Sequence, residues 1–478
     1  MGKTHNRTGS LATQARKFDL NIEKILEDWD VHDAVREIIA NAIDEEILTK
    51  TKKARIFKDA KGLWHVRDFG RGLRYQHLTQ KENDEKLQHP NVIGKFGIGL
   101  KDALATFHRH DTGVFIRSPH GDISLGKSQK HGFKEVVTLH AYVHPPSRPD
   151  LVGTEFVLGC NDSALEKAKD LFLRFSGEQL LERTRYGMVL KKKKETARIY
   201  VNGVMVAQEE NFLFSYNITS LTKAIRSALN RERSNVGRTA YSDRVKSILL
   251  SCEREAVARA IVEDLKGYQE GTQHDELKWK DVAVHACRLL NARADVVFST
   301  PMELATAPDL VDKARADGYE IIPVPQTLQD DIRGLQDPLG RPVRDLQEFQ
   351  REWNESFQFR FVHERNMTAQ ERAVFRMTDD ILALAGGLPA GINEVKISET
   401  MRLDTATYRE AAGICEADRI IIKRDQLQSL QSYAGTLLHE AVHARSGAPD
   451  VSRMFEEWLT NMLGVLVAIC LTAKRAPR

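Results

Sequence analysis

The segment Glu37-Ile-Ile-Ala-Asn41-Ala-Ile-Asp44 decides how the first part of this chain is interpreted. It lies within residues 22–48, whose apolar positions recur at helical spacing, so we expect a helix with Glu37, Asn41 and Asp44 along one polar stripe. Such a stripe suits a magnesium-bound triphosphate, because Glu37 can accept a proton from an attacking water while the Asn41 side-chain oxygen binds Mg²⁺. Taken alone the stripe is weak evidence, since acidic helix faces are usually solvated.

The residues after this helix favour strands separated by glycine-rich turns. A strand-like stretch covers 54–70, and further strands are expected at 114–118, 136–143, 154–158 and 197–206. Helices and strands in this arrangement predict an N-terminal α/β sandwich spanning residues 1–215.

Three glycine-containing blocks follow the polar helix and strengthen the nucleotide interpretation. Asp68 stands at a strand end beside Gly70 and Gly72, where its carboxylate can accept a hydrogen bond from an exocyclic amine while the glycines let backbone approach a flat ring. Residues 93–102, IGKFGIGLKD, can form a lid over phosphates and open a helix whose first amides face negative charge. Gly153-Thr154 adds a small hydroxyl at a strand start.

These four blocks, in this order and at these spacings, resemble the GHKL ATPases of the Bergerat fold, which include gyrase, MutL, histidine kinases, MORC proteins and ninety-kilodalton heat-shock chaperones. The phrase IGKFGIGLKDAL is most similar to the MORC and heat-shock-ninety-like branch. The resemblance implies ATP and Mg²⁺ as cofactors, Glu37 as general base, Asn41 as Mg²⁺ ligand and Asp68 as adenine reader. The cofactor-binding residues it implies are Asn41, Asp44, Asp68, Gly70, Gly72, Gly94, Lys95, Phe96, Gly97, Ile98, Gly99, Leu100, Lys101 and Thr154. In the competing interpretation these glycines are ordinary turns.

The middle of the chain, residues 216–345, predicts a transducer-like α/β domain. It reads as helices up to residue 291, then strand 295–299, helix 307–316 and strand 319–324, before a proline cluster typical of a linker. GHKL ATPases often take a phosphate-sensing cation from the following domain. The candidates are Arg231, Arg233 and Arg238, and the alternative is a solvated basic helix or a nucleic-acid surface.

A second chemical motif, His439-Glu-Ala-Val-His443, lies near the other end of the chain. Apolar residues at helical spacing place it on a helix that Gly447 ends, so the two imidazoles project one turn apart. Two histidines in this geometry can bind one Zn²⁺, and Glu440 can deprotonate a water beside it. A pair of structural helix histidines is the alternative.

A zinc site needs a third ligand, and the next helix offers Glu456 and Glu457, of which at most one can bind. We favour Glu456 because it is in helical phase with Val451-Ser452 and with Leu459-Thr460. Upstream, residues 394–397 and 419–422 predict a hairpin-like pair, and 412–427 could supply an edge strand for a substrate peptide. The stretch resembles the gluzincin metallopeptidases. Thr460 and Asn461 depart from the E-x-x-x-D string that many gluzincins carry, and we expect a mainly helical zincin-like domain over 346–478.

The composition limits the compartment and the partners. The chain has 478 residues, enough for several domains, and a net charge of +3 that gives no global attraction for nucleic acid. Five scattered cysteines indicate neither a disulfide framework nor a cysteine zinc site, so a cytoplasmic protein is expected. The apolar run 458–473 is short for a membrane span, which favours a buried helix.

Together these features predict a zinc-dependent peptidase acting on a protein or peptide and controlled by ATP-driven lid closure or homodimerisation. Joining both sites in one chain favours one regulated activity over two independent ones. Bacterial stress response or anti-phage defence is a hypothesis for its role. The alternative is an ATP-dependent chaperone-like or nucleic-acid clamp protein whose zincin-like domain has no catalytic activity.

Overall fold

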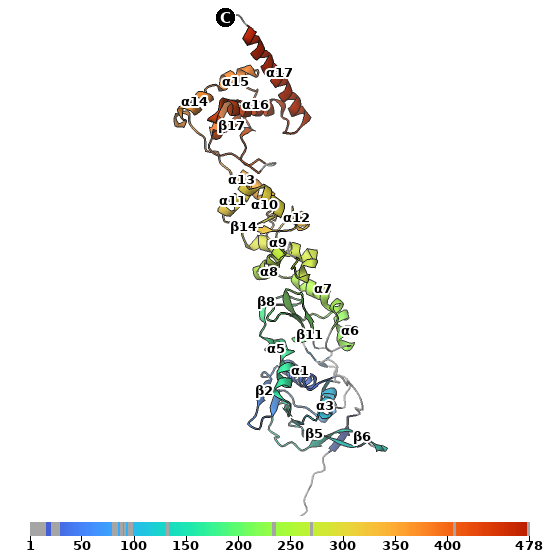
Figure 1. Ribbon diagram of the computed structural model, residues 1–478. Coiled ribbons are helices and arrows are strands. Elements are labelled where there is room, and N and C mark those ends of the chain that lie inside the picture. The colour runs from blue at the N-terminus through green and yellow to red at the C-terminus, as the bar shows by residue number, and fades with distance from the viewer. Residues whose placement is uncertain are drawn as a thin grey trace, which may run out of the picture. The chain divides into compact units, whose positions relative to one another are not determined.

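The computed structural model describes residues 16–20, 29–78, 85–86, 89, 92–93, 99–130, 133–231, 236–267, 271–404 and 408–475. Within them the chain mixes helices with four sheets, as a multidomain α+β protein does (Figure 1). It divides into two compact units, residues 1–264 with 270–286, and residues 265–269 with 287–478. The predicted boundaries after 215 and 345 lie inside these units, so the three-domain division stays a prediction.

The first sheet has seven strands in the order β1-β6-β5-β4-β7-β3-β2, and every neighbouring pair is antiparallel. Antiparallel strands can face a core on one side and remain polar on the other. The strands are β1 (Arg16–Asp19), β2 (Arg55–Lys58), β3 (Trp64–Arg67), β4 (Val114–Arg117), β5 (Asp122–Lys130), β6 (Phe133–His144) and β7 (Glu155–Leu158).

In the described residues this sheet shares one hydrophobic core with the helices α1 (Val31–Thr49), α3 (Gly99–Arg109) and α4 (Asp162–Asp170). Helix α1 begins with a capping box, because the Asp30 side chain accepts from the Asp33 N–H while the Asp33 side chain accepts from the Asp30 N–H. The cap fixes the start of the helix that carries the predicted polar stripe.

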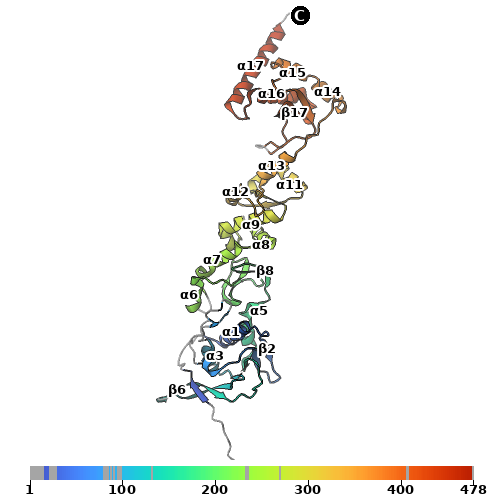
Figure 2. The ribbon, with the colours of Figure 1, turned by 180° about the vertical axis from the view of Figure 1, so that it is seen from behind.

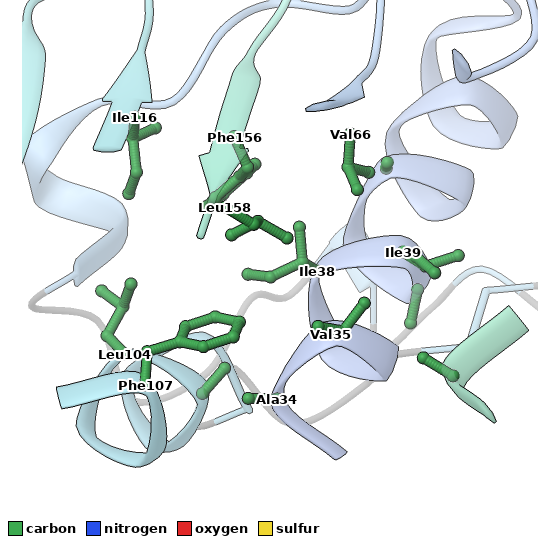
Figure 3. Close-up of a cluster of buried hydrophobic side chains, with 14 of the residues drawn as sticks. Ala34, Val35, Ile38, Ile39, Val66, Leu104, Phe107, Ile116, Phe156 and Leu158 are labelled. Carbon is green, nitrogen blue, oxygen red and sulfur yellow. The ribbon is translucent and has the colours of Figure 1, made fainter. Parts of the chain in front are cut away.

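The apolar side of α1 faces the sheet and α3 (Figure 3). Ile38 lies among Phe107 of α3 and Phe156 and Leu158 of β7, and its side chain is fully buried. Burying an aliphatic side chain of this size stabilises the fold by roughly 1.5–3 kcal/mol. The core therefore fixes the rotation of α1 and, with it, the positions of Glu37, Asn41 and Asp44.

The second sheet has five strands in the order β11-β10-β12-β9-β8, with β10 and β12 parallel. The single strand predicted over 197–206 is wrong, because Asn202 and Gly203, both at positive φ, make a tight turn that splits it into a hairpin. The strands are β8 (Gln179–Arg183), β9 (Gly187–Lys191), β10 (Ala197–Val201), β11 (Val204–Glu209) and β12 (Phe214–Ile218). The neighbouring helices along the chain are α5 (Leu173–Ser176), α6 (Lys223–Arg231), α7 (Arg238–Leu249), α8 (Glu255–Leu265) and α9 (Lys280–Arg293).

The second unit begins with the predicted strand, helix and strand, now β13 (Val296–Ser299), α11 (Pro308–Ala316) and β14 (Glu320–Pro323), with the strands parallel. At the proline cluster expected to mark a linker, buried Asp337 accepts from Asn291 and anchors the following turn, and the linker itself stays a prediction. The other helices of this part are α10 (Pro301–Thr306), α12 (Gln326–Ile332) and α13 (Leu346–Ser356).

The C-terminal part contains a three-stranded sheet in the order β15-β17-β16. The predicted hairpin-like pair is wrong, since β15 and β17 run parallel and the hairpin partner of β17 is β16. Ala417, at positive φ, makes the tight turn between β16 and β17, which the sequence analysis missed. The elements are β15 (Glu394–Ser398), β16 (Gly413–Glu416), β17 (Arg419–Lys423), α14 (Ala369–Phe375), α15 (Thr378–Leu384), α16 (Leu430–Ser446) and α17 (Arg453–Arg475).

Helix α17 contains the apolar run that was expected to be buried. The helix is present, but its burial was predicted wrongly, because Leu463, Val467 and Leu471 are each more than half exposed. Among the residues that the structure describes, one side of α17 packs in this unit, through Phe455, Leu459, Met462 and Leu466. No helix in the described part of the chain is both long and apolar enough to cross a membrane.

Candidate nucleotide site and metal centre

The polar stripe of α1 meets a lysine. Lys86 Nζ donates to Asn41 Oδ1 at 2.9 Å and lies 3.2 Å from Asp44 Oδ2. Asp44 is fully buried and also accepts from the Ile93 N–H at 2.6 Å, while Glu37 pairs with Arg36 at 3.1 Å. An ammonium group therefore occupies the position beside Asn41 where the sequence predicts Mg²⁺.

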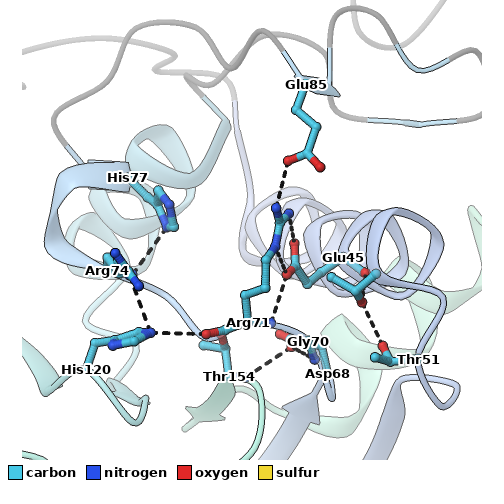
Figure 4. A network of polar contacts seen from close by, with 11 residues as sticks. Glu45, Thr51, Asp68, Gly70, Arg71, Arg74, His77, Glu85, His120 and Thr154 are labelled. Carbon is cyan, nitrogen blue, oxygen red and sulfur yellow. Dashed lines mark hydrogen bonds and ion pairs between the residues drawn. The ribbon is translucent and has the colours of Figure 1, made fainter.

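A second ion-pair cluster borders the same helix (Figure 4). The Arg71 guanidinium binds Glu45 of α1 at 2.9 Å and Glu85 at 2.8 Å, and these carboxylates raise its pKa. Arg71 also holds the pKa of Glu45 below its usual value against the opposing effect of burial. Residues 85 and 86 are thus each tied to α1 or to the turn beside it by a charged group.

Asp68 lies at the end of β3 with its side chain buried. Its Oδ1 accepts from the Gly70 N–H at 2.9 Å and from the Thr154 N–H at 3.1 Å (Figure 4). Burial raises the pKa of Asp68 despite these hydrogen bonds. Gly153, at φ +87°, is required here, because a Cβ would stand 2.2 Å from the Asp68 carbonyl oxygen. Asp68, Gly70 and Thr154 are therefore brought together as the sequence predicts.

The remaining predicted nucleotide residues are only partly covered by the structure. Gly94, Lys95, Phe96, Gly97 and Ile98 lie outside the described residues, as does Arg233. Gly99 is buried at the first residue of α3, where Leu100 and Lys101 are partly buried, and Gly72 has φ +83°. Of the candidate phosphate sensors, Arg238 pairs with Asp275 at 2.7 Å. The Arg238 guanidinium is therefore already engaged in an ion pair within its own unit.

Helix α16 carries the histidine motif and places its two imidazoles side by side. His439 Nε2 and His443 Nε2 are 3.2 Å apart, and Asp450 Oδ1 lies 3.1 Å from the first and 3.2 Å from the second. Ligands about 2.0–2.1 Å from a tetrahedral zinc are about 3.3 Å from one another. The three atoms thus have the separations of one face of a zinc site, and they form the metal-capable group found in the described residues.

The turn after α16 explains how Asp450 reaches the histidines. Gly447 ends the helix in the left-handed conformation, at φ 61°, and the chain then reverses through Ala448. The Ala448 carbonyl lies 2.9 Å from His443 Nδ1, and a hydrogen bond there leaves Nε2 as the lone-pair donor. The sequence analysis missed Asp450, although a carboxylate just beyond a glycine-terminated helix that carries H-E-x-x-H was a usable signal.

Glu440 lies on the buried side of the motif, against the edge strand β16. Its side chain is 6% exposed, and burial raises its pKa to about 7, although a hydrogen bond from the Cys415 backbone opposes this shift. A Cβ at Gly413 would stand 2.7 Å from Glu440 Cγ, so glycine is needed for this approach. Burial also lowers the pKa of His439. With a pKa of about 7, Glu440 can both take up and release a proton near neutral pH, while the lowered pKa of His439 favours the neutral imidazole that binds a metal.

Helix α17 presents Phe455 to the histidines in place of a glutamate. The Phe455 ring stacks on His443 at 4.4 Å and meets His439 edge-on at 4.8 Å. Glu456 is exposed, about 100° around the helix from Phe455, and is not in the metal-capable group. Glu457 pairs with Arg453 on the far side. The structure does not bring Glu456 to the metal-capable atoms, and its ligand role stays a prediction.

Comparison with known proteins gives a family. The family model that matches is the Mycoplasma pneumoniae MPN635 N-terminal domain, over residues 163–255. A Mycoplasma pneumoniae protein described as uncharacterized is 38% identical over 243 residues, which cover 49% of this chain and 97% of that protein. The chain belongs to the same family as that protein. A second Mycoplasma pneumoniae protein with the same description is 24% identical over 342 residues, 67% of this chain and 96% of its own length.

The segment matched by the family model contains the five-stranded sheet and runs from α4 through β8–β12 to the start of α8. Of the candidate residues it includes the arginines Arg231, Arg233 and Arg238. The polar stripe of α1 and the histidine motif of α16 lie outside it.

Proposed function

We propose that the protein is a zinc-dependent peptidase whose activity is controlled by ATP bound in a GHKL-type site. The observation that carries the proposal is the triangle of His439, His443 and Asp450, with the buried carboxyl of Glu440 on the same helix. Two imidazole nitrogens and a carboxylate oxygen at mutual distances of 3.1–3.2 Å are a donor set suited to zinc. Asp450 replaces Glu456 as the favoured third ligand.

The chain's own groups can perform the proton transfers of hydrolysis. Bound zinc supplies a Lewis acid that polarises a carbonyl and acidifies a water. Glu440, with a pKa of about 7, can accept the proton of the attacking water and return it to the leaving amine. Its tight packing on Gly413 fixes the carboxyl beside the histidine pair.

The edge strand next to Glu440 supports a peptide as the substrate. Strand β16 is an edge strand of the three-stranded sheet, and in the described residues it pairs with β17 alone. A free edge can pair with an extended peptide through main-chain hydrogen bonds, which selects a backbone shape rather than particular side chains. Such pairing would place a peptide bond near Glu440.

ATP acts in this proposal as a regulator, because hydrolysis at a zinc centre needs no nucleotide. Asp68 offers a buried carboxylate for the adenine amine, and Asn41 offers an amide oxygen for Mg²⁺. Mg²⁺ fits this position only after Lys86 leaves it. Nucleotide binding is therefore linked to the departure of the Lys86 ammonium from Asn41 and Asp44, which is a physical basis for a switch.

The test uses the full chain, stripped with a chelator and reloaded with zinc. We expect about one zinc per chain by elemental analysis and cleavage of a quenched fluorescent peptide library that depends on ATP and Mg²⁺. Glu440→Gln should keep the zinc and lose cleavage, while Asn41→Ala, which removes the amide oxygen assigned to Mg²⁺, should keep the zinc and lose only the response to ATP. Cleavage by Asn41→Ala that still responds to ATP would refute the coupling, and full function in Glu440→Gln would favour the non-catalytic clamp.

A further inference from the structure

Helix α17 is apolar on all sides and leaves apolar side chains exposed outside its one packed side. Leu463 and Val467 are each 57% exposed and Leu471 is 55% exposed, while Val465 and Trp458 are at least 40% exposed. The C-terminal half of α17 extends past the other elements of its unit in both views (Figures 1 and 2). A helix that is apolar on all sides is normally buried on all sides. In the described residues, other elements pack against a single side of α17.

The charges of α17 stand only at its two ends. From Trp458 to Ala473 the sequence has no charged residue, whereas Arg453, Glu456 and Glu457 precede this run with a net charge of −1, and Lys474 and Arg475 follow it. Two copies of α17 laid antiparallel would bring the acidic start of each beside the basic end of the other. A parallel pair would instead place like charges together at both ends. The charge pattern is therefore self-complementary in the antiparallel direction.

The outward surface of α17 allows close approach at the middle of that run. At about 100° per residue, Gly464 and Ala468 lie opposite the packed side formed by Phe455 and Met462. A Cβ added at Gly464 would meet no atom within 4 Å. Small residues at this spacing let two helix backbones approach closely, with the larger apolar side chains packing around them.

We propose that α17 pairs antiparallel with α17 of a second copy of this chain, crossing near Gly464 and Ala468. This contact covers the apolar surface and joins opposite charges at both ends of the helix. It differs from any ATP-driven pairing through the first unit, and it forms without nucleotide. It rests neither on the zinc site nor on the ATP site, so it can fail or hold independently of the proposed function.

The first test is the molar mass of the full chain without nucleotide, measured by size-exclusion chromatography with light scattering. We expect a dimer for the native sequence and a monomer for Ala468→Glu, because each dimer would bury two unpaired carboxylates. Ala468 is exposed, so the fold tolerates the change, and circular dichroism checks this. Met302→Glu, which adds the same charge at a side chain 74% exposed on α10, should remain dimeric. A monomeric native protein, or a dimeric Ala468→Glu protein, would overturn the proposal.

The second test measures the direction of the pair by disulfide cross-linking in a Cys470→Ser background. An antiparallel crossing places Gly464 opposite Ala468 of the second copy, so a mixture of Gly464→Cys and Ala468→Cys chains should cross-link several-fold more than either alone. Efficient cross-linking of Gly464→Cys with itself would indicate a parallel pair and refute the arrangement. Flotation of a monomeric native protein with phosphatidylcholine vesicles would show that lipid covers α17 instead.

Discussion

The polar face of α1 and the histidine face of α16 differ in how their charge is balanced. On α1, the oxygens of Asn41 and Asp44 already bind a cation of the protein, Lys86. On α16, His439, His443 and Asp450 direct three lone-pair atoms at one another, and the ion pairs of the described residues bring no lysine or arginine to them. The first site is neutralised by the chain itself, while the second has the geometry of a site that needs an added cation.

Removing a histidine should give the largest effect and would sharpen this comparison. His439→Ala should weaken zinc binding at least about 100-fold, because a site with three protein ligands loses one of its strong bonds to the metal. Competition with a fluorescent zinc chelator measures it. Asp450→Asn should also weaken binding by at least about 10-fold, and Glu456→Gln should leave it within about 2-fold. If Glu456→Gln weakens zinc more than Asp450→Asn, the third ligand is assigned to the wrong residue.

The buried carboxyl of Glu440 should make the metal-free protein less stable as the pH rises. Its folded pKa of about 7 exceeds the ordinary 4.5, so its stabilising contribution is complete below pH 4.5 and is lost as the pH rises through 7. The shift corresponds to about 3 kcal/mol at most. Glu440→Gln should therefore melt higher than the native protein at pH 8 in a chelator, and not at pH 4.5.

The matched control for that measurement is Glu457→Gln, which removes an exposed carboxylate of α17. Its melting temperature should follow the native protein at both pH values. Equal pH dependence of the native protein and Glu440→Gln would show that Glu440 is not held neutral by burial.

At the candidate nucleotide site, a single substitution of Asp68 can replace the proposed hydrogen-bond acceptor for adenine by a donor. Asp68→Asn keeps an oxygen for the Gly70 and Thr154 N–H groups but turns an amide donor toward the adenine amine. ATP affinity measured by calorimetry should fall about 10–100-fold, the value of one hydrogen bond to a charged group. The preference for ATP over GTP should fall with it. Asp162→Asn, at an exposed carboxylate of α4, should change neither, and an unaltered preference in Asp68→Asn would remove Asp68 from adenine recognition.

Much of the fold could be predicted because it depends on local patterns. The polar stripe of α1, the strand ends at Asp68 and Thr154, and the helix of His439 follow from apolar spacing and glycine punctuation. The pairing of β15 with β17 could not, because strand direction is set by long-range packing rather than by composition. The turn at Asn202-Gly203 was available in the sequence and was missed.

The candidate sites show the same division between local and long-range information. The two histidines were predicted by helical spacing, whereas the third donor depends on how the chain turns after Gly447. The sequence predicted Glu456 or Glu457 of α17 as a ligand, whereas Phe455 is the residue of α17 that contacts the imidazoles. Lys86 lies far from Asn41 in sequence, so the cation on the stripe could not be foreseen from the helix.

The smallest predicted effect concerns Lys86 and tests whether its ammonium stands in for a metal. Lys86→Met removes a cation from fully buried Asp44, which should destabilise the metal-free protein by about 1 kcal/mol, a shift of a few degrees in melting temperature. Millimolar Mg²⁺ should restore most of that loss in Lys86→Met while moving the native protein by less. Lys58→Met, which breaks the exposed pair with Asp162, should show no rescue by Mg²⁺. If Mg²⁺ stabilises the native protein and Lys86→Met equally, Lys86 and the metal do not compete, and the contrast between the two sites loses its basis.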